Sequence, residues 1–92
     1  AERKRLQVET APKKTTKAKL IKLADKISNV RDVTASPPPW WDFARRVEYL
    51  NWTERVVAGL RGASPELEAL YDHVLAEGRE KLSEEAQVQA RQ

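Results

Sequence analysis

Three helix-breaking stretches divide the sequence, and they limit the possible folds more strongly than any other feature. They are "TAPKKTT" at 10–16, "TASPPP" at 34–39 and "RGASP" at 61–65. Proline lacks a backbone N–H and disfavours helical geometry in the preceding residue, while glycine suits the left-handed conformation that ends many helices. The segments between the breaks show helical spacing and no alternating strand pattern. The sequence therefore predicts an all-α fold with short connectors.

The breaks leave four helical segments. Residues 1–9 are predicted as the end of a helix, followed by helices over about 16–32 and 40–60, and by a fourth that begins beside Ser64 and fades near Leu82. Thr15 or Thr16 is expected to cap the second segment, Ser64 to cap the fourth, and Gly62 to adopt a left-handed conformation. Residues 1–82 form the predicted domain, and 83–92 form a polar tail that either extends the last helix or is disordered.

One apolar stripe runs along the segment 16–32, and polar residues border it. The stripe consists of Leu20, Leu23, Ala24, Ile27 and Val30. Asp25 and Asn29 are four residues apart, so they lie one turn from each other on one side of the helix. That side adjoins the stripe, which places Asp25 at the edge of the core, whereas Lys26 is expected to lie largely away from the stripe.

The charge is distributed unevenly along the chain. Residues 1–31 carry ten Lys or Arg against three acids, whereas residues 32–92 carry seven against eleven. Such a basic segment favours a polyanionic partner, namely a phosphate-rich ligand, a nucleic acid or an anionic lipid surface. The simpler explanation is a solvated face of lysines on a helix.

Asp25 has two interpretations. It pairs with Lys22 and Lys26 on the helix surface, or its oxygen is a ligand for a hard metal ion such as magnesium or manganese. The chain has no cysteine and one histidine, His73, which is expected to be a surface or packing residue. A metal site at Asp25 would therefore need ligands from outside these residues.

Arg45 and Tyr49 form a second candidate pair, four residues apart on the third segment. Arginine clamps a phosphate with two donors, and a tyrosine ring stacks on a base. The alternative is a surface arginine that covers a half-buried tyrosine. Of the adjacent tryptophans, one is expected in the core and the other over the connector, and Trp52 is expected in the core.

Four blocks of sequence, in order, resemble the small alarmone hydrolases, the stand-alone relatives of the RelA/SpoT hydrolase domain. They are "ERKRLQVETAP", "AKLIKLADKISNVRDV", "RVEYLNWTERVVAGLRG" and "LEALYDHVL". The most specific word is "KLADK-x-x-N-x-R-D". The resemblance covers roughly residues 2–80 and matches the C-terminal half of that domain.

The resemblance implies the C-terminal helices of an HD-type metallohydrolase that removes the 3′-pyrophosphate from guanosine 3′,5′-bis(diphosphate). It implies a manganese ion with Asp25 among its ligands, and a nucleotide pocket that includes Asn29, Arg45, Tyr49 and, more weakly, Lys22. The other metal ligands, a histidine and a His-Asp pair, and the Glu-Asp pair beside the reactive water belong to the N-terminal half. No catalytic residue is therefore assigned within the chain. We expect a fragment of a longer protein, inactive until it associates with that missing half.

Two other functions remain open at this point. One is an HD-type phosphohydrolase of another nucleotide, and the other is a non-enzymatic basic helical module that binds nucleic acid, with an affinity that falls steeply with salt. The hydrolase interpretation makes nucleic acid an improbable partner. Because the sequence has neither a signal-peptide pattern nor a long apolar run, we expect a cytoplasmic protein without a membrane partner.

Overall fold

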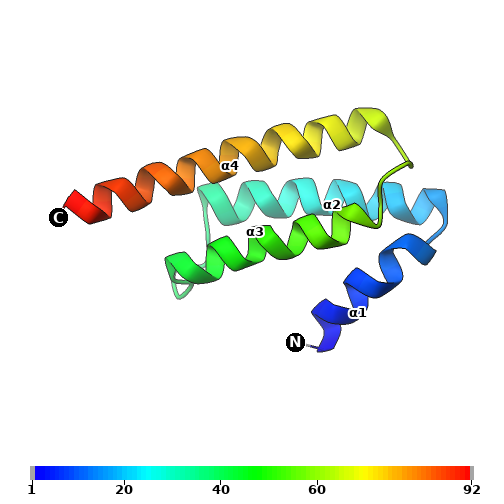
Figure 1. The fold of residues 1–92 in the computed structure, drawn as a ribbon, viewed down its shortest axis with the longest axis horizontal. Coiled ribbons are helices and arrows are strands. Elements are labelled where there is room, and N and C mark those ends of the chain that lie inside the picture. Colours follow the sequence, from blue (N-terminus) through cyan, green and yellow to red (C-terminus); the bar gives the residue numbers. More distant parts are fainter. Residues whose placement is uncertain (1, 92) are drawn as a thin grey trace.

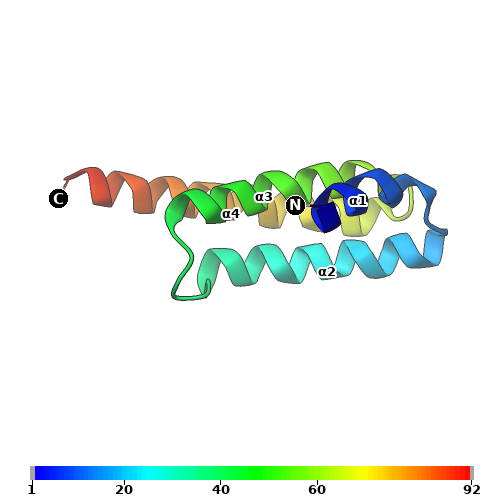
Figure 2. The ribbon, with the colours of Figure 1, turned by 90° about the horizontal axis from the view of Figure 1, so that it is seen from below.

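The computed structural model describes residues 2–91, and all regular structure within them is helical. The elements are α1 (Glu2–Thr10), a short 3-10 turn η1 (Ala11–Lys13), α2 (Thr16–Ala35), α3 (Phe43–Ala58) and α4 (Pro65–Arg91). The helices α2, α3 and α4 lie side by side as a bundle, and α1 packs against α3 (Figures 1 and 2). The all-α prediction is confirmed. No helix in the described residues combines the length and the apolar character that crossing a bilayer requires.

Side-chain caps fix where three of the helices begin. Thr15, Asp42 and Ser64 each accept a hydrogen bond from the backbone N–H three residues on, at 3.2, 2.8 and 3.2 Å. Such caps satisfy donors that have no partner within the helix. The predicted caps of α2 and α4 are confirmed. The predicted start of the third helix at residue 40 is wrong, because Asp42 caps the helix and α3 begins at Phe43.

Two helices extend further than predicted. Helix α2 continues to Ala35, and α4 does not fade near Leu82 but continues to Arg91. Leu82 is buried, and Glu85 forms an ion pair with Arg46 of α3, so tertiary contacts support the later turns. The polar segment is therefore helical as far as Arg91, and its last turns extend beyond the other helices (Figure 1).

The core lies between α2, α3 and α4. Its fully buried members include Leu23, Val30, Leu50, Val57, Leu60 and Tyr71. The predicted place of Ala24 in the apolar stripe is wrong, since Ala24 is exposed; Leu6 of α1 and Leu70 of α4 are exposed as well. Helix α1 instead packs against the core through Val8, which is partly buried.

Two glycines allow close contacts between elements. A Cβ atom on Gly78 would lie 2.8 Å from Thr34 Oγ1 of α2, and one on Gly59 would lie 2.7 Å from Pro12 Cδ of η1. Gly78 therefore permits the close approach of α4 to α2, and Gly59 permits that of η1 to the end of α3. Gly62 has a φ of 97°, which confirms its predicted left-handed conformation.

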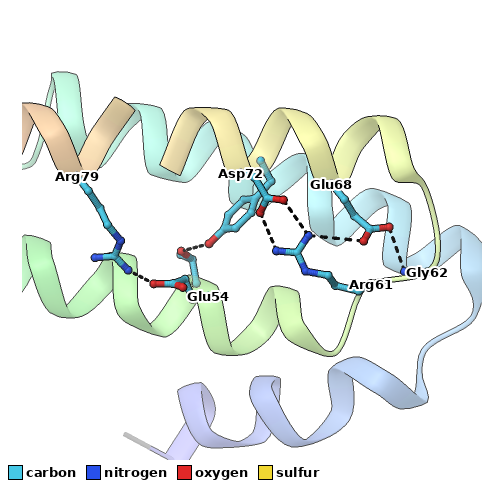
Figure 3. A network of polar contacts seen from close by, with 8 residues as sticks. Glu54, Arg61, Gly62, Glu68, Asp72 and Arg79 are labelled. Carbon is cyan, nitrogen blue, oxygen red and sulfur yellow. Dashed lines mark hydrogen bonds and ion pairs between the residues drawn. The ribbon is translucent and has the colours of Figure 1, made fainter. Parts of the chain in front are cut away.

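Polar contacts join α3 and its following turn to α4 (Figure 3). Arg61 Nη2 lies 2.7 Å from Asp72 Oδ1, and Arg79 pairs with Glu54. These pairs are largely exposed, so each contributes little to stability. The buried hydroxyl groups of Thr53 and Tyr71 lie 2.8 Å apart, and this hydrogen bond satisfies both groups inside the core.

Candidate functional site

The fold brings two of the predicted substrate residues together, although they lie on different helices. Asn29 on α2 and Tyr49 on α3 are both half-buried. The pKa of Tyr49 is raised above its ordinary value of 10.0, chiefly by burial and further by the Asp32 carboxylate, and the neighbouring Asn29 side chain opposes this shift. The phenol group of Tyr49 is therefore adjacent to the amide group of Asn29 at the junction of α2 and α3.

A row of aromatic rings on α3 and its preceding connector extends this junction. The ring centroid of Tyr49 lies 5.5 Å from that of Trp41 and 5.3 Å from that of Trp52, with the planes tilted by about 55°. These are favourable separations for aromatic pairs. Arg45 stands over Trp41, with Cζ 4.4 Å from the ring centroid. Trp52 is buried as predicted. The prediction that one of the adjacent tryptophans belongs to the core is wrong, because Trp40 is 76% exposed and Trp41 is only half-buried.

Two lysines that sequence reasoning missed also contact these rings. Lys4 Nζ of α1 lies 5.5 Å from the Tyr49 ring centroid and 5.4 Å from that of Trp52. Lys26 Nζ of α2 lies 4.6 Å from the Trp52 centroid, and this residue is only 5% exposed. Cations are attracted to the negative faces of such rings. We call the whole surface the cationic–aromatic face, made up of Lys4, Lys26, Asn29, Trp41, Arg45, Tyr49 and Trp52.

The predicted positions of Asp25 and Lys26 are both corrected. Lys26 was expected to lie away from the apolar stripe, and Asp25 at the core edge; in the structure Lys26 is buried and Asp25 is exposed. The reason is that Lys26 points toward α3 and stacks on Trp52. Lys22 is half-buried, and the charges of both Lys22 and Asp25 influence the pKa of Lys26, so both lie near it. Asp25 thus borders the cationic–aromatic face.

The described residues do not complete a metal site around Asp25 by themselves. Within residues 2–91, no three His, Cys, Asp or Glu side chains gather in an arrangement suited to a metal ion. His73 is exposed, with Nε2 3.1 Å from Glu77 Oε1, so it is a surface residue as predicted. One carboxylate does not fit a manganese site by itself, since such sites need several oxygen or nitrogen ligands.

Replacing Lys26 with methionine is expected to raise the free energy of unfolding at pH 7. The pKa of Lys26 lies below its ordinary value of 10.5. Burial is the main cause and the charge of Lys22 adds to it, while the negative charge of Asp25 offsets only part of the decrease. The folded state then binds this proton less tightly than the unfolded state. This difference lowers the free energy of unfolding by its full amount below the pKa that Lys26 has in the folded state, and the effect disappears as the pH rises through 10.5.

Denaturant unfolding of the Lys26→Met variant and the original chain at pH 7 and above pH 10 measures this effect. Methionine keeps an unbranched side chain against Trp52, and its advantage should shrink at the higher pH. Lys17→Met, at an exposed lysine of α2, is the control. A Lys26→Met variant that is less stable than the original chain at pH 7 would show that the ammonium group is net stabilising.

Comparison of the sequence with those of known proteins finds relatives that are named enzymes. The chain is 51% identical over 73 residues to guanosine-3′,5′-bis(diphosphate) 3′-pyrophosphohydrolase MESH1 of Xenopus tropicalis, and 48% identical over 73 residues to each of the MESH1 proteins of Drosophila melanogaster and Homo sapiens. The predicted resemblance to the small alarmone hydrolases is confirmed. Each alignment covers 79% of this chain and 41% of the relative, so the chain spans about two fifths of the length of these MESH1 proteins. No family model matches the chain.

A solved structure agrees with the MESH1 resemblance. It is that of a metazoan ortholog of SpoT, described as hydrolyzing ppGpp and playing a role in starvation responses. The two structures superpose with a TM-score of 0.78 at 46% sequence identity, over 83% of this chain and 43% of the other. The helices of this chain therefore have the arrangement found in part of a ppGpp hydrolase.

Proposed function

We propose that this chain forms part of a guanosine 3′,5′-bis(diphosphate) 3′-pyrophosphohydrolase, and that its share of the active site is the substrate-binding face beside Asp25. The proposal rests on the sequence identity of about one half between this chain and MESH1 proteins, which are named as pyrophosphohydrolases of this nucleotide. The proximity of Asn29 on α2 to Tyr49 on α3, with Arg45 on the same helix as Tyr49, is consistent with it. A basic module that binds nucleic acid has no comparable support.

The cationic–aromatic face suits both parts of such a nucleotide. A purine stacks on aromatic rings, and Tyr49 and Trp41 provide them beside the Arg45 guanidinium group. Arg45 and Lys22 are suited to phosphate oxygens, and the Asn29 amide group is suited to the ribose and its phosphates. In this proposal these four residues, Asn29, Arg45, Tyr49 and Lys22, hold and orient the substrate.

Asp25 is assigned a different role. Its exposed carboxylate is available as one ligand of a manganese ion whose remaining ligands come from a part of the enzyme that these 92 residues do not include. The chain alone should then be inactive, because neither the metal site nor the groups that activate water are complete. The expected cytoplasmic location remains a prediction.

A chimera tests the proposal. We expect activity when the matched segment of Xenopus tropicalis MESH1 is replaced by the corresponding residues of this chain, and none from the 92-residue chain alone. Release of pyrophosphate from ppGpp in the presence of Mn²⁺ measures the reaction. The unmodified relative is the positive control, and the relative without the segment is the negative control. A chimera that folds and binds Mn²⁺ but leaves ppGpp intact would reject the proposal, and preferential hydrolysis of another nucleotide such as NADPH would reject the assigned substrate.

A further inference from the structure

A groove lined by both charged and apolar side chains lies between α1 and α3, next to the cationic–aromatic face. It consists of two adjoining hollows of about 420 and 330 Å³ that share Lys4, Trp52 and Arg55. Arg5, Val8 and Glu9 complete the first, and Glu48 and Asn51 complete the second. None of the four substrate residues proposed above lines it, but Lys4 and Trp52 belong to both the groove and the cationic–aromatic face.

The cations in this groove differ in how far they are neutralised. Arg5 pairs with Glu2 and Glu9 on its own helix, with Nη1 2.6 Å from Glu9 Oε1. Within residues 2–91, neither Lys4 nor Arg55 has a carboxylate within ion-pair distance. These two charges are therefore available to an anion. The remaining acid at the rim, Glu48, is exposed and can turn into solvent.

A hydrogen bond fixes the geometry of the groove. The indole N–H of Trp52 donates to the backbone carbonyl of Lys4 at 3.0 Å, which attaches α1 to α3. From this point the Lys4 side chain reaches toward the rings of Tyr49 and Trp52. Lys4 therefore connects the groove with the surface on which the nucleotide is proposed to lie.

We propose that the groove binds a diphosphate group, with Lys4 and Arg55 as its cationic ligands and the Asn51 amide as a further donor. Arginine offers two parallel donors to phosphate oxygens, and lysine offers a compact charge. The diphosphate group is either inorganic pyrophosphate or the second diphosphate of a nucleotide on the adjacent face, and the latter rests on the proposed function.

The tryptophan indole resonances provide a local test. Titration of the ¹⁵N-labelled 92-residue chain with inorganic pyrophosphate should shift the Trp52 indole signal and leave that of the exposed Trp40 in place. Lys4→Gln and Arg55→Gln should each weaken binding about tenfold, the effect of losing one charged hydrogen bond. Arg31→Gln, at an exposed arginine of α2, is the matched control. An unmoved Trp52 signal, or equal affinity in the three variants, overturns the proposal.

Further measurements distinguish free pyrophosphate from a nucleotide as the source of the diphosphate, and they test the groove proposal separately from the hydrolase proposal. Tighter binding of GDP than of pyrophosphate, with Tyr49→Ala weakening GDP alone, identifies a diphosphate of the bound nucleotide; equal affinities identify free pyrophosphate. In the chimera, Lys4→Gln and Arg55→Gln should raise the KM for ppGpp if the nucleotide supplies the group. An active chimera combined with no pyrophosphate or GDP binding at Trp52 rejects the groove alone. Binding at Trp52 combined with a folded, inactive chimera rejects the hydrolase alone.

Discussion

Replacing Asp25 with asparagine in the chimera is expected to reduce hydrolysis of ppGpp by more than about 100-fold, because loss of even an indirect partner of a metal ligand costs about 10–100-fold. Asparagine keeps the size of the side chain but replaces the anionic carboxylate with a neutral carbonyl oxygen, which is a weaker ligand for a hard cation. Asp25 is exposed and forms no ion pair within residues 2–91, so the substitution should leave the fold almost unchanged. A loss of activity would then reflect the site and not unfolding.

The measurement is kcat/KM for ppGpp over a range of Mn²⁺ concentrations, together with the affinity for Mn²⁺. If Asp25 is a ligand, the variant should need far more Mn²⁺ and should recover only part of the rate. Asp72→Asn makes the same chemical change at an exposed position of α4, where it breaks only the surface pair with Arg61, and should stay within about twofold. Full activity of Asp25→Asn at low Mn²⁺ would remove Asp25 from the metal site.

Local sequence signals predicted the helices well because caps and breaks act within a few residues. Thr15 and Ser64 begin their helices as expected, and Gly62 has the expected conformation. The errors occur where tertiary contacts decide the outcome. Helix α4 continues past Leu82 because α3 supplies a partner for Glu85, and that partner lies 39 residues away in the chain.

The candidate site was predictable only in part. The spacing of Arg45 and Tyr49 and the "LAD" word marked residues on single helices, but spacing could not pair Asn29 with Tyr49. Lys26 could have been found, since it is four residues before the buried Val30, although a lysine is rarely assigned to the interior. Lys4 carried no such signal. Lys4 belongs to the cationic–aromatic face because the indole N–H of Trp52, 48 residues later in the chain, donates a hydrogen bond to its backbone carbonyl.

Arg46 is a buried polar residue whose loss should strongly destabilise the fold. Its Nε and Nη2 atoms donate to the carbonyl oxygens of Val33 and Thr34 at 3.1 and 2.9 Å, and Nη1 donates to Glu85 Oε2 at 2.7 Å. The two carbonyls belong to the last turn of α2, where helical acceptors have no partner within the helix and a cation is favourable. Arg46→Met should lower the free energy of unfolding by about 3 kcal/mol, since each buried carbonyl left unpaired costs about 1–3 kcal/mol.

Urea unfolding followed by circular dichroism measures this loss, and two further variants divide it. The Glu85 side chain is 37% exposed, so water can replace its partner, and Glu85→Gln should cost less than about 1 kcal/mol. Arg79→Met removes an arginine whose one ion pair within residues 2–91 is with the exposed Glu54, and it should also cost less than about 1 kcal/mol. If Arg46→Met costs no more than Arg79→Met, the end of α2 does not depend on this guanidinium group. If Glu85→Gln costs as much as Arg46→Met, the contact with α4, and not the two carbonyls, is the principal stabilising interaction.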